Sequence, residues 1–271
     1  MAWSSRFSFQ FTRTSSATSF VFLPTTTLPL QIHFPSVSAR RSITTKTTRA
    51  KMDIGAYEQD LAIAIKAASL AARLCQSVQK SLLQTDTQAK MDSSPVTVAD
   101  YGSQALVSFV LERELQSGVF SMVAEEDSGD LQKNDAQDMV ERITALVNET
   151  ISNDSAYNIS PLTTGDVLAA IDRGKSEGGP HGRHWVLDPI DGTKGFLRGD
   201  QYAVALGLLD EGEVILGVLA CPNLPWTSVS ISARPSNDPI GCLFSARKVP
   251  LKSLKMHLSL NHMRQHIPCM T

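Results

Sequence analysis

The chain has 271 residues, of which 42% are hydrophobic, so it can bury a sizeable core and is not globally disordered. Residues 1–51 carry seven basic residues and no acidic one, which leaves 18 basic and 27 acidic residues, a net charge of −9, for residues 52–271. A net negative charge of this size in residues 52–271 disfavours binding to the nucleic-acid backbone and is compatible with a site for divalent cations. No run of 18 or more apolar residues is present, so we expect no membrane-spanning helix.

Residues 1–51 are rich in serine and threonine, a composition typical of organelle transit peptides. Three prolines interrupt any long amphipathic helix, and arginine is absent between Arg13 and Arg40, where a mitochondrial presequence would place its basic face. We therefore predict a disordered transit peptide that directs the chain to the chloroplast, with the mitochondrion as the alternative.

The body is predicted to begin with helices. Apolar residues recur at helical spacing from Tyr57 to Leu83, which predicts a long amphipathic helix. Residues 93–97 are expected to form a turn into an extended piece, and a second helix follows from about Ala99 to Leu115. The next expected elements are a strand at 119–124, a helix at 135–151, a loop at 153–160, and a short helix capped by Thr163 or Thr164 and ending at Ile171.

The second half of the body is predicted to consist mainly of strands. A short strand at 184–187 is expected to stop at Asp188-Pro189, and a hairpin follows whose apolar strands, 202–209 and 214–221, are joined by residues 210–213. Further short strands are expected at 229–233 and 242–245. Helices and antiparallel strands in separate blocks indicate an α+β or layered α/β architecture.

The last 25 residues, 247–271, differ from the body because they contain no acid, five basic residues and three of the six histidines. We expect no further strand there and interpret the segment as an atypical basic tail. Out-of-frame or intron-derived sequence, a basic surface helix, and a nucleic-acid or membrane tail remain alternatives. The four cysteines (Cys75, Cys221, Cys242 and Cys269) lie far apart with no C-x-x-C pair, which indicates reduced thiols and gives no signal for redox control.

The segment from Asp188 to Thr193 gives the strongest indication of a metal-binding or catalytic site. Asp188 and Asp191 are three positions apart around a tight turn, so their carboxylates can converge on one point, and the Ile190 carbonyl offers a third oxygen for a hard cation such as Mg²⁺. The N–H groups of Gly192 and Thr193, at the start of a possible helix, can hold a phosphate, and the Thr193 hydroxyl can orient a water. An aspartate cap beside a turn aspartate, with no metal, is the alternative.

Two other acidic positions belong to the same hypothesis. Glu125-Glu126-Asp127 follows the strand at 119–124, and its three like charges repel one another unless a cation or solvent separates them. Asp100 lies at an expected helix start, where it is either a helix N-terminal acid or a group that orients or deprotonates a water. Alone, the glutamate pair is more often a solvated turn and Asp100 more often a helix N-terminal acid.

Taken together, these motifs resemble the Mg²⁺-dependent, lithium-sensitive phosphatase superfamily, which includes the inositol monophosphatases and the fructose bisphosphatases. The resemblance rests on Ser94-Pro95-Val96-Thr97 with Asp100, on Glu125-Glu126, and on the segment 188–196. The segments 194–199 and 221–224 are most similar to the 3′(2′),5′-bisphosphate nucleotidases. The resemblance extends from about Tyr57 to Ala246 and implies a sugar-phosphatase (inositol monophosphatase-like) fold for residues 52–246.

The resemblance also implies residue roles and a reaction. The implied metal ligands are Glu125, Asp188, the Ile190 carbonyl and Asp191; Asp100 and Thr193 would activate the attacking water, and the Gly192 and Thr193 amides would hold the phosphate. The family uses two or three Mg²⁺ ions and cleaves 3′-phosphoadenosine 5′-phosphate to AMP and phosphate. Some members also take 3′-phosphoadenosine 5′-phosphosulfate or inositol 1,4-bisphosphate. We expect a small-molecule partner of this kind, no nucleic acid and no membrane, and leave the oligomeric state open.

The sequence departs from the family pattern at two places. Ala124 stands where a glycine often precedes the glutamate pair, and no Trp-Asp-x-x-Ala-type motif follows Ala246. In the family, that motif lies in a second α/β domain and completes the second metal site, so the resemblance implies an incomplete second site and low activity. Two alternatives therefore stay open: a non-catalytic truncated isoform that binds metal, a phosphate ligand or a full-length partner, and an inositol monophosphatase-type activity.

Overall fold

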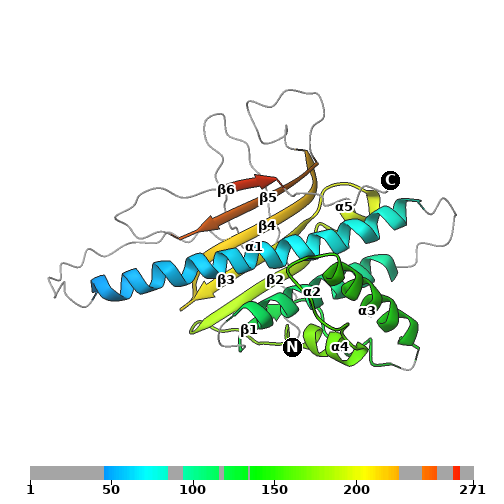
Figure 1. The fold of residues 1–271 in the computed structure, drawn as a ribbon, viewed down its shortest axis with the longest axis horizontal. Helices are drawn as coiled ribbons and strands as arrows, with labels where there is room; N and C mark the ends of the chain where they lie inside the picture. Colours follow the sequence, from blue (N-terminus) through cyan, green and yellow to red (C-terminus); the bar gives the residue numbers. More distant parts are fainter. Residues whose placement is uncertain are drawn as a thin grey trace, which may run out of the picture. The chain divides into compact units, whose positions relative to one another are not determined.

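The computed structural model describes residues 46–84, 94–115, 119–133, 135–225, 240–248 and 259–262 (Figure 1). The elements follow in the order α1 (Lys46–Gln84), α2 (Ser94–Glu114), β1 (Ser121–Ala124), α3 (Gln137–Ser152), α4 (Thr164–Asp172), β2 (Arg183–Asp191), α5 (Thr193–Arg198), β3 (Ala203–Asp210), β4 (Glu213–Pro225), β5 (Ile240–Arg247) and β6 (Ser259–His262). The leader up to residue 45, the predicted strand at 229–233 and most of the predicted tail lie outside these residues.

The strands form one sheet in the order β1–β2–β3–β4–β5–β6. β1 pairs with β2 in parallel, and every later neighbour is antiparallel. The β3–β4 hairpin turns at Glu211-Gly212, where φ is 51° and 75°, as a two-residue type I′ turn requires. This confirms the predicted hairpin.

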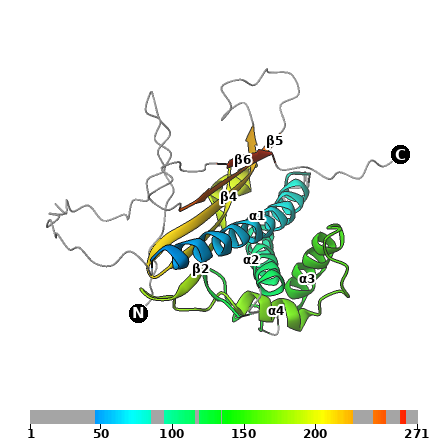
Figure 2. The same ribbon diagram turned by 60° about the vertical axis from the view of Figure 1, so that its left-hand side comes forward.

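Helices α1 and α2 pack against the sheet, α1 over β3 to β5 and α2 on β2, and α3 and α4 pack on α2 (Figures 1 and 2). The predicted layered α/β architecture is therefore confirmed. The largest fully buried side chains come from both layers and include Leu70, Leu74, Leu106, Leu111, Leu206, Leu208 and Leu216. Each such side chain contributes roughly 1.5–3 kcal/mol when it leaves water.

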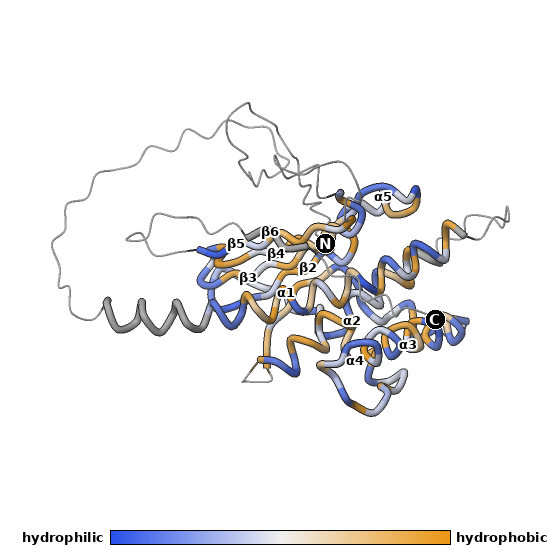
Figure 3. The backbone as a smooth tube through the Cα atoms, turned by 45° about the horizontal axis from the view of Figure 1, so that its top comes forward, coloured by the Kyte–Doolittle hydropathy of each residue, from blue (hydrophilic) through white to orange (hydrophobic). Residues whose placement is uncertain are grey.

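Helix α1 begins at Lys46, earlier than Tyr57 and inside the segment expected to be a disordered leader. Its section Tyr57–Leu83 is long and apolar enough to cross a membrane by length and composition, a signal that a search for unbroken apolar runs misses. In the structure this section packs on α2 and β4, with Leu70 and Leu74 fully buried. Apolar and polar residues alternate along it in Figure 3, as in a core helix with one exposed side.

Helix α2 begins at Ser94, so the prediction of a turn and an extended piece at residues 93–97 is wrong for 94–97. Pro95 lies in the first helical turn, where a missing N–H costs nothing because that group has no partner within the helix. Asp100 therefore lies inside the helix and not at its start. Every residue from Tyr101 to Leu111 is buried, because α1, α3, α4 and β2 all pack on this helix.

Strand β2 continues through Asp188-Pro189, where the sequence predicted its end. Asp188 pairs with Ala205 and Asp191 pairs with Ala203, so β2 holds one residue more than β3 over this stretch, which is a β-bulge. Pro189 lies beyond Leu187, the last residue of β2 that pairs with β1. Its missing N–H therefore removes no bond from the β1–β2 ladder.

The remaining predicted elements fit closely, with one exception. Thr163 caps α4, one of the two caps predicted, and the structure adds a reciprocal bond with Asp166 that completes a capping box. The strand expected at 242–245 is the centre of β5. However, β6 pairs antiparallel with β5 inside the predicted tail, so the expectation of no strand after Ala246 is wrong.

Candidate active site

The register of the parallel pair places two predicted ligands side by side. Ala124 at the end of β1 is the partner of Leu187 in β2, so Glu125 and Asp188 come next in register on adjacent strands. Neighbouring strands lie about 4.8 Å apart. Glu125 and Asp188 therefore lie next to one another where the pairing of β1 with β2 ends.

The β-bulge brings in the third carboxylate. In a regular strand Asp188 and Asp191 would face opposite sides of the sheet, because they are three positions apart and successive side chains alternate between the two faces. The bulge uses one residue, so the two aspartates pair with Ala205 and Ala203, which lie on the same face of β3. The sequence prediction that Asp188 and Asp191 converge is thus explained by a bulge and not by a turn.

The pKa of Asp100 responds to the same carboxylates. Burial, followed by the negative charges of Glu126, Glu125 and Asp188, raises the pKa of Asp100 to about 8. Burial, followed by Asp191 and Glu125, raises the pKa of Asp188 to about 7, against a bond from the Ile190 N–H that lowers it. Groups on α2, β1 and β2 that are distant in sequence are therefore close enough to repel one another.

The two other members of the cluster are shifted in the same direction. Burial is the main reason that the pKa of Glu126 is raised, with Glu125 the next cause, and a hydrogen bond with Tyr101 partly offsets both. Burial raises the pKa of Asp191. Among the described residues, no lysine or arginine acts on Asp100, Asp188 or these two groups. Within the part of the chain that the structure describes, the cluster therefore has no basic counter-charge.

The donor set fits a hard cation in kind. Carboxylate and carbonyl oxygens are the ligands that Mg²⁺ takes, and a divalent ion would offset the mutual repulsion of the cluster. The described part of the chain contains no group of three or more His, Cys, Asp or Glu side chains already gathered to coordinate a metal. Glu125 in particular is exposed. Binding therefore requires these side chains to turn toward a common point.

Gly192 and Thr193 follow the cluster directly. Gly192 adopts the left-handed conformation, with φ 94°, and leads into α5. The Thr193 hydroxyl donates a hydrogen bond to the Ile190 carbonyl at 3.3 Å, so it shares this oxygen with any ion bound there. Both residues are exposed beside the carboxylates. Their roles in holding phosphate and activating water stay predictions.

Helix α5 is fastened by residues that the sequence did not single out. Gln79 of α1 donates to the Phe196 carbonyl at 2.8 Å and accepts a bond from Asn223 of β4 at 2.8 Å. Asn223 also donates to the Asp200 carbonyl at 2.7 Å. These contacts hold the segment after Thr193 against α1 and β4. Asn223 belongs to the segment 221–224 that carried the resemblance, which was the only signal of its position.

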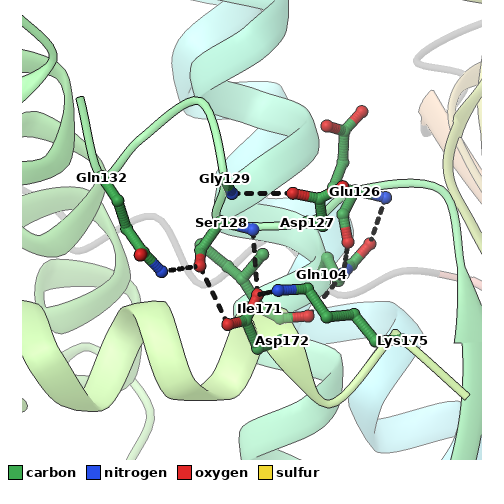
Figure 4. Close-up of polar contacts among 9 residues, drawn as sticks. All are labelled: Gln104, Glu126, Asp127, Ser128, Gly129, Gln132, Ile171, Asp172 and Lys175. Carbon is green, nitrogen blue, oxygen red and sulfur yellow. Dashed lines mark hydrogen bonds and ion pairs between the residues drawn. The ribbon is translucent and has the colours of Figure 1, made fainter.

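Gln104 was also missed, although it lies one helical turn after Asp100. Its side-chain Nε2 donates to the carbonyls of Glu126 at 2.6 Å and Ile171 at 2.7 Å, and its Oε1 accepts from the Glu126 N–H at 3.1 Å. Figure 4 shows this amide beneath the segment that follows β1. The backbone of the glutamate pair is therefore fixed by α2.

The turn after Glu126 is anchored on the last residue of α4. The N–H and the hydroxyl of Ser128 both donate to the Asp172 carboxylate at 2.9 Å (Figure 4). Gln132 donates to the Ser128 hydroxyl, and Lys175 pairs with Asp172 at 2.7 Å. The acidic segment thus leaves β1 along a fixed path.

Comparison with known proteins identifies the same region. The model of the family described as the inositol monophosphatase family matches residues 92–264. This range includes every predicted site residue. It also extends past Ala246, where the resemblance read from the motifs was expected to end.

Similar proteins carry more specific names. A 3′(2′),5′-bisphosphate nucleotidase 1 from Arabidopsis thaliana is 69% identical over 193 residues, which cover 70% of this chain and 55% of that protein. A 3′(2′),5′-bisphosphate nucleotidase from Oryza sativa is 64% identical over 192 residues, covering 70% and 53%. A solved inositol monophosphatase from Anabaena is 19% identical, covering 74% and 47%, with a TM-score of 0.38. The chain spans about half the length of the curated relatives that it matches.

Proposed function

Because the chain belongs to the inositol monophosphatase family, we propose that it is a Mg²⁺-dependent phosphatase that removes the 3′-phosphate of 3′-phosphoadenosine 5′-phosphate. The observation that carries the proposal is that the charges of Glu125 and Asp188 both act on buried Asp100, while no lysine or arginine among the described residues does. The choice of substrate is supported by the names of the relatives at 69% and 64% identity. The products are AMP and inorganic phosphate.

In this proposal the cluster divides into binding and proton-transfer roles. Glu125, Asp188, Asp191 and the Ile190 carbonyl would hold Mg²⁺, which when bound neutralises the phosphoryl oxygens and favours ionised carboxylates around it. Asp100 would take the proton of the attacking water through the Thr193 hydroxyl. This role requires ionised Asp100, whose pKa of about 8 keeps it largely protonated at neutral pH in the absence of a cation.

The phosphate itself would be bound at the start of α5. The first N–H groups of a helix have no partner within the helix and attract anions. Gly192 and Thr193 lie at this end, next to the carboxylates. Thr193 would thus contribute its amide to the phosphate and its hydroxyl to the water that attacks it in line.

Phosphate release by the purified chain tests the proposal. The substrate is 3′-phosphoadenosine 5′-phosphate, with inositol 1-phosphate as competitor, measured with Mg²⁺, with Mg²⁺ and Li⁺, and with EDTA. Asp191→Asn should abolish turnover, whereas Asp138→Asn, which removes an exposed carboxylate in α3, should leave it unchanged. We expect release only with Mg²⁺, inhibition by Li⁺, and little effect of inositol 1-phosphate. Absence of turnover in the folded wild-type chain would contradict the proposal and favour a non-catalytic binding role.

We further propose that residues 1–51 direct the chain to the chloroplast, on the support of their Ser/Thr-rich, acid-free composition. A fluorescent protein fused to these residues in plant cells should accumulate in plastids, and the same protein without them should not. Accumulation in mitochondria would favour the alternative address, and retention in the cytosol would contradict both.

A further inference from the structure

Helix α2 carries two buried polar residues, Ser103 and Gln104, next to Asp100. Both side chains are fully buried. Buried polar groups are costly unless they are hydrogen-bonded, so the partners of these two residues are informative. Each contacts a different one of the two segments that carry the carboxylate cluster.

Gln104 holds the segment that follows β1. Its amide accepts the N–H and binds the carbonyl of one residue, Glu126, as a neighbouring strand would. The second bond of its Nε2, to the Ile171 carbonyl at 2.7 Å, ties the same amide to α4. The peptide directly after Glu125 is thereby fixed from two elements.

Ser103 holds the other segment. Its hydroxyl donates to the carbonyl of Pro189 at 3.3 Å. Pro189 lies in the bulge of β2, between Asp188 and Asp191. Adjacent residues on one helix therefore bind the backbone of both carboxylate-bearing segments and join them through a rigid element.

This connection opposes the repulsion within the cluster. Like charges held close without a counter-ion favour structures in which they move apart. Gln104 resists that movement without adding a charge, and its amide fits beside Gly174 because a Cβ atom at that position would lie only 2.5 Å from Nε2. The backbone of both ligand-bearing segments is thus held in place before a cation arrives, so that only the side chains have to turn toward it.

We propose that Ser103 and Gln104 are positioning residues that set the spacing between the Glu125 segment and the Asp188–Asp191 segment, and thereby the affinity for a divalent cation. The inference rests on the proposed function, because it assigns these residues to the metal site of that reaction. Residues outside the ligand shell that fix the ligands typically change metal affinity by roughly 10- to 100-fold when replaced.

The test compares, in the full chain, two amide side chains that each hydrogen-bond the N–H and the carbonyl of a single residue. Gln104→Met keeps the length of the side chain and removes its hydrogen bonds. Asn148→Leu is the matched control, because Asn148 of α3 bridges the N–H and the carbonyl of Leu162, at 2.8 Å and 2.9 Å, away from the carboxylates. Mn²⁺ binding is followed by the loss of the free-ion signal in electron paramagnetic resonance, and Tm is measured for each variant.

Both substitutions should lower Tm, but only Gln104→Met should weaken Mn²⁺ binding, by about tenfold or more. Ser103→Ala, a milder change, should weaken it in the same direction, and it replaces Gln104→Met if that variant does not fold. Unchanged Mn²⁺ affinity in the Ser103 or Gln104 variants, with wild-type binding intact, would overturn the inference and leave the proposed function standing. A folded wild-type chain that binds no Mn²⁺ would instead overturn both.

Discussion

Gly174 leaves the space that the Gln104 amide occupies: a Cβ atom at position 174 would lie 2.5 Å from Gln104 Nε2 and 2.8 Å from the Ala124 Cβ. Real Cβ atoms do not approach other atoms so closely, so an alanine at position 174 must displace either the Gln104 side chain or β1. We expect Gly174→Ala to destabilise the fold by about 1–3 kcal/mol. Gly217→Ala is the control, because nothing lies within 4 Å of its Cβ position.

Urea denaturation measures this difference. The Gly174→Ala transition should shift to lower urea, and the shift should shrink when Gln104 is already methionine, because the two substitutions act on the same contact. Equal stability of the Gly174→Ala and Gly217→Ala variants would contradict the close packing described for Gln104.

The pH dependence of stability without metal follows from the raised carboxyl pKa values. Asp100 and Asp188 keep their protons to higher pH in the folded chain, at about 8 and about 7, than in the unfolded chain, where 3.8 applies. Between about pH 4 and pH 8 the folded state therefore binds more protons than the unfolded state, so the stability of the fold decreases as pH rises across this range. In EDTA we expect Tm to be lower at pH 9 than at pH 5.5.

Asp100→Asn identifies the source of this fall. The variant lacks the titrating carboxyl, so its Tm should decrease less between pH 5.5 and pH 9 than that of the wild type. Scanning calorimetry in EDTA at several pH values gives both slopes. Parallel slopes for the two proteins would mean that Asp100 titrates in the folded chain much as it does in the unfolded chain.

Gly195 of α5 lies so close to the backbone of the following loop that replacing it should strongly destabilise the fold. Its Cβ position lies 2.0 Å from the Gln201 carbonyl oxygen and 3.1 Å from the carbonyl carbon, and these are backbone atoms that cannot rotate away. Gly195→Ala should therefore cost about 3 kcal/mol or more. Gly207→Ala, whose nearest neighbour is at 3.7 Å, should be tolerated. Similar Tm values for both variants would contradict the observed approach of residues 195 and 201.

The sequence predicted the elements whose signals are local. The turn at residues 210–213 and the cap of α4 by Thr163 each depend on a few neighbouring residues, and both are present as expected. The motifs also predicted which carboxylates would act together, and their role as metal ligands stays a prediction. Its assembly from a parallel strand pair and a bulge required the structure, since Asp188-Pro189 alone is typical of a strand end.

The features that the sequence missed depend on contacts between distant elements. Nothing near Gln104 indicates that its amide meets Glu126, which is 22 residues away, or Ile171, which is 67 residues away. Ser94-Pro95 suggests a turn until the packing of α1 and α3 on α2 favours a helix. Strand β6 was missed because its pairing with β5 comes from a segment whose composition differs from that of the body.

We predict that these carboxylates repel one another until a cation binds them, and Tm with and without Mg²⁺ at pH 8 tests this most directly. Asp188→Asn removes one charge of the cluster and one proposed ligand. In EDTA the variant should melt above the wild type, whereas Mg²⁺ should raise the Tm of the wild type and not that of the variant. A wild-type Tm that Mg²⁺ leaves unchanged, or raises equally in both proteins, would contradict the prediction.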